Sequence, residues 1–380
     1  MSVVFINHPL ETWTPTSSGA LATIIWQCCR LEAEQPDPPY VITRGSSAAR
    51  FPWPRTFTID PPPLPTHPLA VKILRAERKL TGWRHLRHRA YAFQVAAIIA
   101  KQKLEAYPFV LINDPEMAVY LRRRFPQARI LHWFQNQLES SDRFRALYAQ
   151  AVDVTAGVSD FTSRWVSSYY GVPDVHTLYN GVDLDQFTAR VAGRDETPIL
   201  NFVGRTGIEK APDLLLRAAL RLSDTTRAFG VQMIGSNHWD RFELDDYQRS
   251  LLDLVAQLET RGIAVARPGH LGREALPAAI RKAHIHIVPS RWDEPFGLTT
   301  VEGMASGLAV VASHTGGTPE VVGEAGLLFA RDNAEELAEQ LGGLIADPDL
   351  RVRYAHQARA RAQEFPWQRT WQGLRSLLAV

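Results

Sequence analysis

Two glutamates in the second half of the chain have the spacing and setting to hold a ligand that is rich in hydroxyl groups. Glu294 lies on a loop after the predicted buried strand 285–288, and Glu302 lies in a helix that we expect to begin near Gly297. Carboxylates so placed can accept hydrogen bonds from two sets of hydroxyls, for example a ribose and a hexose. The backbone N–H groups at the helix start also suit hydroxyls or phosphate. Taken alone, either glutamate can equally be an ordinary surface acid.

The residues around these glutamates extend the pattern over three segments. Seven residues, including Pro-Phe-Gly-Leu, separate the two glutamates, and Gly316-Gly317-Thr318-Pro319-Glu320 follows after the next predicted strand. The other two segments are Asn201 to Asp213 and Tyr179-Asn180-Gly181-Val182-Asp183. Together they resemble family 4 glycosyltransferases, the retaining enzymes with the GT-B fold among the glycosyl transferases of group 1. The resemblance covers most of the chain and is strongest over residues 155–330.

The resemblance implies a role for each matching residue. Arg205 and Lys210 would neutralise a nucleoside diphosphate without a metal. The guanidinium group of Arg205 would act as a bidentate fork and the ammonium group of Lys210 as a point charge. Glu294 would bind a hydroxyl of the transferred sugar, and Glu302 the ribose. Ala211 stands where the family usually has glycine, which predicts a tighter loop. The other predicted donor-binding residues of this half are Gly204, Gly235, His270, Leu271, Phe296, Gly297, Leu298 and Thr299.

The first half offers fewer candidates. Gly19, after Ser17-Ser18, opens a predicted helix and resembles one of two glycines that in the family approach the donor phosphate from across the cleft. His132 is similar to the family's active-site histidine, and we expect it at a strand end, bonded to hydroxyls of the transferred sugar. His8 is a weaker candidate of the same kind. A plain turn at Gly19 and a structural histidine at position 132 are the alternatives.

Short apolar runs alternate with helical patterns, which indicates an α/β fold built on parallel sheets. We expect two Rossmann-like domains facing a cleft (GT-B), with a C-terminal helix crossing back to the first domain. The predicted domains are an acceptor-binding domain at 1–187, a donor-binding domain at 188–362 and the returning helix at 363–380. Residues 52–68 are rich in proline, and we expect them to form a surface excursion outside the sheet. The other predicted strands are 3–7, 40–43, 109–113, 129–134, 153–158, 199–203, 231–234, 309–312 and 327–329.

The expected activity is transfer, with retention, of a hexose-type sugar from a nucleoside-diphosphate sugar to an acceptor hydroxyl. The donor would be a UDP-sugar, with GDP- or ADP-sugars as alternatives, and the acceptor a glycan, a lipid-linked molecule or a small molecule in glycan, polysaccharide or glycolipid synthesis. No metal-ligand cluster is visible in the sequence, so we expect neither a metal nor a cofactor. The alternatives are a sugar-nucleotide epimerase of the same fold and a non-catalytic sugar-nucleotide-binding module.

Composition and charge indicate the class of protein, its cellular location and its partners. Hydrophobic residues make up 45% and charged residues 22% of the 380 residues, as in ordinary globular proteins. The neighbours Cys28 and Cys29 are the only cysteines, and together with an N-terminus that lacks a basic leader they predict a cytoplasmic location. The basic run from Lys72 to Arg89 predicts a peripheral contact with an anionic inner membrane surface or a phosphate-linked acceptor, with a solvated helix face as the alternative. No nucleic-acid-binding motif accompanies it.

Overall fold

The computed structural model describes residues 2–15, 19–46, 48–60, 86–190, 196–235 and 244–379. The chain divides into two compact units. Unit 1 comprises Met1–Asn180 together with Trp367–Val380, and unit 2 comprises Gly181–Pro366. We had predicted the two boundaries at 187/188 and 362/363.

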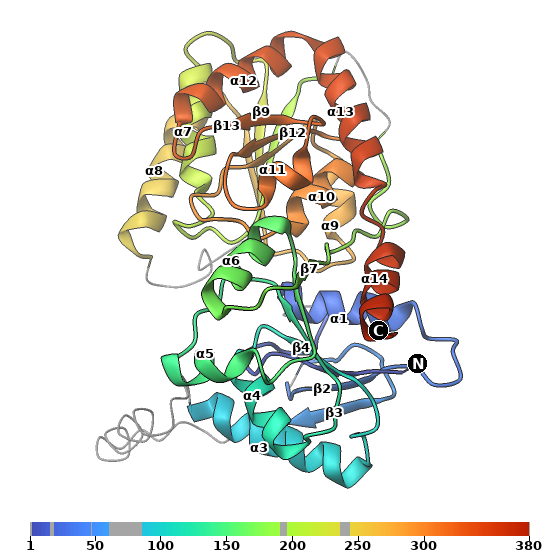
Figure 1. The fold of residues 1–380 in the computed structure, drawn as a ribbon. Helices are drawn as coiled ribbons and strands as arrows, with labels where there is room; N and C mark the ends of the chain where they lie inside the picture. The colour runs from blue at the N-terminus through green and yellow to red at the C-terminus, as the bar shows by residue number, and fades with distance from the viewer. Residues whose placement is uncertain are drawn as a thin grey trace. The chain divides into compact units, whose positions relative to one another are not determined.

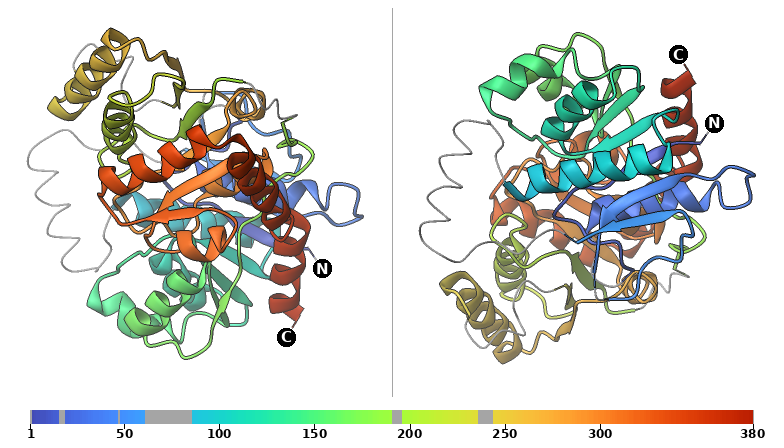
Figure 2. Two further views of the ribbon diagram at one scale, coloured as in Figure 1. Left: turned by 90° about the horizontal axis from the view of Figure 1, so that it is seen from above. Right: turned by 90° about the horizontal axis from the view of Figure 1, so that it is seen from below.

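Unit 1 is built on a seven-stranded parallel sheet with the order β3-β2-β1-β4-β5-β6-β7. Figures 1 and 2 show its strands and helices. The strands are β1 Val4–Ile6, β2 Tyr40–Arg44, β3 Thr56–Ile59, β4 Phe109–Ile112, β5 Ile130–Phe134, β6 Val154–Gly157 and β7 Val175–Thr177. The helices are α1 Ala20–Arg30, α3 Leu86–Gln102, α4 Pro115–Arg124, α5 Asp142–Tyr148, α6 Asp160–Tyr170 and α14 Trp367–Ala379.

Unit 2 repeats this architecture with a six-stranded parallel sheet, in the order β10-β9-β8-β11-β12-β13. Its strands are β8 Ile199–Val203, β9 Gly230–Ile234, β10 Val265–Gly269, β11 Ile285–Val288, β12 Ala309–Ser313 and β13 Leu327–Phe329. Its helices are α7 Pro212–Leu222, α8 Asp246–Thr260, α9 Leu276–Ile280, α10 Leu298–Ala305, α11 Thr318–Val322, α12 Ala334–Ala346 and α13 Pro348–Ala362. The predicted α/β fold with two Rossmann-like sheets is therefore confirmed.

Side chains on successive residues of the central strands point to opposite faces of each sheet, as a strand requires. In β1, Val4 and Ile6 join a buried cluster with residues of α3 and α4, whereas the ring of Phe5 lies 6.1 Å from that of Trp371 in α14. In β8, Leu200 and Phe202 pack with α7, α8 and α12, while Asn201 lies on the other face and bonds His286 of β11. Both sheets are therefore covered by helices on both sides, which is why the central strands β1, β4, β5, β11 and β12 are buried along their whole length.

In each sheet the strand order reverses at one place. The chain winds outward from β1 to β3 and then restarts at β4 on the other side of β1; in unit 2 the same reversal falls between β8 and β11. Loops that leave the carboxyl ends of two such strands diverge, and the crevice between them is the usual ligand site of open α/β sheets. The residues after β1 and β4, and those after β8 and β11, are therefore the places to examine.

Three strands lie outside our prediction, and each is short or at an edge. β7 has three residues and β10 contains Pro268, which an edge strand tolerates because one side of its backbone needs no partner. The expectation that residues 52–68 lie wholly outside the sheet was wrong. Thr56–Ile59 pair with β2 as the edge strand β3, and the consecutive prolines begin only at Pro61.

The C-terminal helix α14 belongs to unit 1, as expected of a helix that crosses back. It packs against α1, and the indole N–H of Trp371 donates a 2.6 Å hydrogen bond to the buried carboxylate of Glu32. Arg375 reaches the same carboxylate oxygen at 3.3 Å. A charge-assisted bond in a buried setting is worth about 1.5–3 kcal/mol, so this contact fixes α14 on its unit.

We expect Trp371→Phe to lower the melting temperature of the protein by about 3–8 °C. The phenyl ring keeps the contact with Phe5, but the Glu32 carboxylate loses its shorter hydrogen bond and keeps only the one from Arg375. Gln372→Ala, at the exposed neighbouring position, is the control and should shift the melting temperature by less than about 1 °C. Equal melting temperatures for the two variants would show that the bond to Glu32 does not hold the helix.

Candidate functional site

At the reversal point of unit 2, the loops after β8 and β11 meet through an ion pair. The ammonium group of Lys210, on the first loop, contacts the carboxylate of Glu294, on the second, and lies 4.9 Å from the centre of the Trp292 ring. Ser290 donates a 2.7 Å hydrogen bond to the same carboxylate oxygen. Two residues that we predicted for the same site thus touch each other, while Ser290 and Trp292 are additions that sequence reasoning had not selected.

The carboxylate of Glu294 is buried yet ionised. Burial alone would raise its pKa, but the charge of Lys210 and the hydrogen bonds from Lys210 and Ser290 outweigh that effect and lower the pKa below its usual value. Lys210 is in turn held in one place by this partner. The pair is therefore a fixed, nearly neutral unit at the carboxyl ends of the strands, with Lys210 Nζ as its cationic end.

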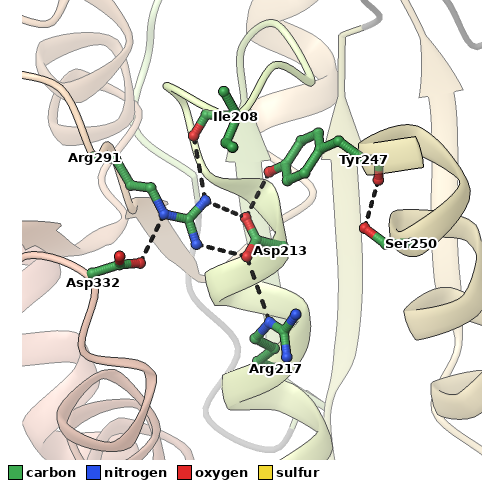
Figure 3. A network of polar contacts seen from close by, with 7 residues as sticks. All are labelled: Ile208, Asp213, Arg217, Tyr247, Ser250, Arg291 and Asp332. Carbon is green, nitrogen blue, oxygen red and sulfur yellow. Dashed lines mark hydrogen bonds and ion pairs between the residues drawn. The ribbon is translucent and has the colours of Figure 1, made fainter. Parts of the chain in front are cut away.

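A second set of contacts fixes the same two loops, and Figure 3 shows it from close by. The guanidinium group of Arg291 makes a bidentate pair with Asp213 at the start of α7, with both N–O distances 2.7 Å. Its Nη1 also reaches the carbonyl of Ile208, and its backbone N–H donates to the carbonyl of Glu209 at 2.9 Å. Arg291 therefore joins the β11 loop to both the β8 loop and the helix that follows it.

Further groups hold this network from outside. Nε of Arg291 donates to Asp332 at 2.7 Å, and the hydroxyl of Tyr247 donates to Asp213 at 2.6 Å. Burial would raise the pKa of Asp213, but the hydrogen bonds from Arg291 and Tyr247 outweigh it, so the pKa is lowered and the carboxylate stays ionised. A fully bonded Asp213 can act as a rigid anchor for the loop that carries Lys210.

Glu302 lies in α10 and faces Arg273, which the sequence had not led us to select. The two side chains form an ion pair at 2.6 Å, with Glu302 buried and Arg273 partly exposed. Burial raises the pKa of Glu302, and the charge of Arg273 offsets only part of that rise. The second oxygen, Oε2, is buried and has no hydrogen-bond partner among the described residues. It is the acceptor of this site that protein contacts leave unused.

The start of α10 lies beside these acids. Gly297 adopts a left-handed conformation with φ +84° and no side chain caps the helix, so Leu298 and Thr299 begin it with their backbone N–H groups outside the helical ladder. Phe296 is buried, with its ring 5.7 Å from that of Phe365. Of the four predicted residues of this stretch, Phe296 therefore packs in the core. Gly297, Leu298 and Thr299 lie at a helix terminus that suits polar oxygens.

Three glycines, two directly after β8 and β9 and one at the end of β10, pack backbone against backbone. Gly235 has φ +122°, and a Cβ there would come within 2.0 Å of the carbonyl oxygen of Gly204. The N–H of Gly204 donates to Ile234, and that of Gly235 to Gly269. His270 and Leu271 follow directly, exposed and half-buried respectively. The structure therefore brings Gly204, Gly235 and Gly269 together, with His270 and Leu271 next in the chain, and the contact of these residues with a donor stays a prediction.

The loop from Gly204 to Ala211 has one cation that is loosely held. Arg205 pairs with Glu209 at 2.9 Å, but its side chain is 61% exposed, and exposed pairs contribute little to stability. Ala211, by contrast, is buried with φ +50°, a left-handed conformation that costs a non-glycine residue about 1–2 kcal/mol. Ala211 thus adopts a conformation that glycine tolerates more readily, so the predicted tightness of the loop takes the form of strain at this residue.

In unit 1, Gly19 precedes α1 as predicted, and Ser17 and Ser18 lie outside the described residues. Its N–H donates at 2.8 Å to the carboxylate of Glu11, and a Cβ at Gly19 would come within 2.4 Å of that group. A protein carboxylate thus occupies the start of the helix. The approach of Gly19 to a donor phosphate stays a prediction.

His132 does not lie at a strand end, which corrects our expectation. It is the third of the five residues of β5 and is fully buried. Its Nε2 accepts from the Asp114 N–H at 3.0 Å and its Nδ1 lies 2.8 Å from the Tyr148 hydroxyl, so both ring nitrogens have protein partners. Burial lowers its pKa to about 3 and keeps the ring neutral. A contact between His132 and a sugar is untested.

The strand-end position of β5 is held by Gln135. This residue is buried and accepts a 2.8 Å hydrogen bond from Asn180, the asparagine of the Asn-Gly-Val-Asp segment. Its Nε2, and the Oδ1 of Asn180, have no hydrogen-bond partner within the described part of the chain. Gln135 directly follows the predicted strand 129–134, so its position at a strand end was visible in the sequence.

The structure brings together three potential metal ligands that the sequence had not suggested, while the expectation that the protein needs no metal stays a prediction. His88, Asp114 and Glu116 are buried in unit 1, and one ligand atom from each lies within 4.8 Å of the others. The sequence gives no sign of this group because the histidine lies in α3, 26 positions before Asp114.

Of the basic run 72–89, residues up to 85 lie outside the described residues. None of the described helices is both long and apolar enough to cross a membrane.

Comparison with known proteins agrees with the site in unit 2. Residues 185–361 match the family Glycosyl transferases group 1. This match spans nearly the whole of unit 2 and includes Arg205, Lys210, Glu294 and Glu302. D-inositol 3-phosphate glycosyltransferase of Saccharomonospora viridis is 34% identical over 224 residues, which are 55% of this chain and 51% of the relative. About half the length of that relative thus lies outside the match.

Solved structures extend the similarity to the whole fold. Sucrose-phosphate synthase from Thermosynechococcus elongatus superposes with a TM-score of 0.76 at 19% identity and covers 100% of this chain and 98% of its own. Anabaena HepE in complex with UDP and glucose gives a TM-score of 0.71 at 16% identity, with 99% of both chains covered. Identities this low establish the shared fold, which is that of GT-B glycosyltransferases.

We expect Arg291→Lys to lower the melting temperature of unit 2 by about 3–8 °C. Lysine keeps a charge but cannot make the bidentate pair with Asp213 while also bonding Asp332 and Ile208. Arg217→Gln is the matched control, because Arg217 approaches the same Asp213 at 3.5 Å from an exposed position, and it should cost less than about 1 °C. If the two variants melt alike by calorimetry, Arg291 is not the anchor of the two loops.

Proposed function

We propose that the protein is a retaining glycosyltransferase that binds a nucleoside-diphosphate sugar in unit 2 and moves its hexose-type sugar to an acceptor hydroxyl. The observation that carries this is the arrangement at the reversal point of unit 2. Buried Glu302 there keeps an unused acceptor oxygen, and the neighbouring loops hold Lys210 and Glu294 in contact. An orphan buried carboxylate oxygen is costly unless a ligand uses it, and a pair of vicinal ribose hydroxyls supplies suitable donors.

The donor that we propose first is a UDP-sugar, with GDP- and ADP-sugars as alternatives. The relative of the same fold, HepE, holds UDP and glucose. In this proposal Glu302 and Arg273 hold the ribose, and the backbone groups beside Gly235, His270 and Leu271 hold the base. Arg205 and Lys210 neutralise the diphosphate, so that no metal is needed beside it. Arg205 suits this role because its own side chain is exposed, so that its pair with Glu209 is easily exchanged for one with phosphate.

The proposed reaction is a displacement on one face of the sugar. The bond from the anomeric carbon to the diphosphate oxygen breaks, and the acceptor oxygen forms the new bond from the same side. The acceptor's proton passes to the departing phosphate oxygen. The Glu294 carboxylate is already engaged by Lys210 and Ser290, so it suits a hydroxyl-binding task better than covalent attack on the anomeric carbon. Catalysis then rests on positioning and on charge stabilisation of the leaving group.

The proposed acceptor is a glycan, a lipid-linked molecule or a phosphate-bearing small molecule, bound by unit 1. The relative named for D-inositol 3-phosphate makes a phosphorylated small molecule the first one to test. We further propose a cytoplasmic enzyme that meets the inner membrane surface through residues 72–89, whose charge suits anionic lipid.

Release of nucleoside diphosphate tests the activity. The protein is incubated with UDP-, GDP- and ADP-sugars, with and without D-inositol 3-phosphate or a lipid-linked glycan. Acceptor-dependent release of one diphosphate supports a transferase, and analysis of the anomeric linkage by NMR tests retention. A new sugar nucleotide without release identifies an epimerase. Stabilisation by the sugar nucleotide without turnover of any acceptor identifies a binding module, and either outcome would refute the proposal.

We expect Arg205→Ala to lower kcat by roughly 10²- to 10³-fold, the scale for losing one donor that stabilises developing charge. Lys210→Ala should act similarly, and Lys210→Arg should restore activity only in part because its fork does not fit the Glu294 contact. Arg221→Ala, an exposed arginine of α7 paired with Glu335, is the control for surface charge. A kcat within about threefold of wild type would remove Arg205 from the diphosphate site.

The two glutamates should separate binding from turnover. Glu302→Gln replaces a carboxylate acceptor with an amide, so we expect at least about tenfold weaker binding of the nucleoside diphosphate by calorimetry. Glu294→Gln should lower kcat more than donor affinity, because its proposed ligand is the transferred sugar. Variants that change only the melting temperature, with donor affinity and kcat intact, would make both residues structural.

A further inference from the structure

We propose that unit 1 binds one divalent metal ion between His88 of α3 and Asp114 and Glu116 at the start of α4. The three side chains are 7%, 5% and 3% exposed, and one ligand atom of each lies within 4.8 Å of the other two. Two ligand atoms about 2.1 Å from one tetrahedral zinc ion lie about 3.4 Å apart. A separation as large as 4.8 Å would therefore shorten by about 1.4 Å when the three groups share one ion.

The position of the cluster in the fold supports a ligand site. Asp114 lies two residues beyond β4, and β4 pairs with β1 where the strand order of unit 1 reverses. His8 lies two residues beyond β1, and its ring meets that of His88 edge-on at 5.1 Å. The cluster thus occupies the crevice at the carboxyl ends of β1 and β4 that open α/β sheets use for ligands.

An unused buried oxygen points to a cation at this place. Asp114 Oδ1 accepts from the N–H of Met117 at 3.0 Å and so caps α4, but Oδ2 is buried with no hydrogen-bond partner among the residues described. A buried carboxylate oxygen left without donor or cation costs about 1–3 kcal/mol or more. Because Glu116 contributes a second carboxylate beside it, a divalent cation would satisfy both at once.

Neighbouring groups hold the ligands in place, as outer contacts do around protein metal sites. The hydroxyl of Ser140 donates a 3.4 Å hydrogen bond to a carboxylate oxygen of Glu116, and the N–H of Asp114 donates to Nε2 of the neutral His132 ring. The buried His132 thereby gains a positioning task, because it orients the turn that carries Asp114. The outer contacts come from the backbone of α4, from β5 and from the loop before α5.

The ligand chemistry indicates which ion would bind. One imidazole nitrogen with two carboxylate oxygens suits Zn²⁺ and Mn²⁺ better than Mg²⁺, which prefers oxygen ligands throughout. Three protein ligands also leave room for water or for an oxygen of another ligand. The inference concerns unit 1 alone and does not depend on the proposed transfer of sugar, since binding of the ion is measured without any substrate.

The experiment uses the full chain, stripped with EDTA and dialysed. We expect calorimetry to give one Zn²⁺ per chain, with weaker binding of Mn²⁺ and weaker still of Mg²⁺, and metal analysis after gel filtration to give the same stoichiometry. Asp114→Asn and Glu116→Gln are nearly isosteric, and asparagine still caps a helix, so both should fold. Each should weaken Zn²⁺ binding at least tenfold and abolish the rise in melting temperature that Zn²⁺ causes in wild type.

His356→Gln, at an exposed position of α13, is the control for zinc held by surface histidines and should bind as wild type does. Circular dichroism without metal verifies that each variant is folded. Three results would overturn the proposal: no binding at 1 mM Zn²⁺, an affinity that changes less than threefold in both carboxylate variants, or loss of the site in His356→Gln.

Discussion

The bidentate ion pair between Arg291 and Asp213 is the contact on which the geometry of unit 2 depends. Parallel strands deliver their loops to one edge of the sheet, but they do not fix where the loops go afterwards. Arg291 fixes them by bonding the start of α7, the carbonyl of Ile208 and, through its own N–H, the carbonyl of Glu209. Lys210 is the next residue, so its contact with Glu294 follows from this anchor and not from the attraction of the two charges alone.

The close packing of glycine backbones imposes a second constraint on the same edge. Gly316 has φ +54°, and a Cβ there would come within 2.3 Å of the carbonyl oxygen of Glu294. Gly235 approaches Gly204 in the same manner. Side chains are therefore excluded where the loop after β9 passes the loop after β8, and where the loop after β12 passes the loop after β11. Because no side chain separates these backbones, the charged residues that they carry lie close together. The two units share this plan, since in unit 1 too the buried polar residues follow the two strands at the reversal.

The sequence predicted the parts of this fold that carry strong local patterns. Apolar strands such as β8, β11 and β12 were found because they are buried on both faces, and the unit 2 site was located because its residues lie in a few short segments. The edge strands β3 and β10 were not predicted because their sequences include or lie close to proline and lack a continuous apolar run. His132 was misplaced because an apolar run does not show where a strand ends. Partners distant in sequence, such as Arg273 for Glu302 or His88 for Asp114, carry no local signal; only the fold brings them together.

The path of the chain has a consequence for the order in which the protein is made. Unit 2 is one continuous segment, 181–366, inserted into unit 1, and its two ends are tied side by side where Val182 donates to the carbonyl of Phe365 at 2.8 Å. Unit 1 needs α14, which follows unit 2 in the chain, to cover one face of its sheet. During synthesis unit 2 is therefore made while Phe5 and Glu32 still lack Trp371. Unit 1 closes only after unit 2 has been made, and until α14 is in place its sheet exposes an apolar face that a chaperone can bind.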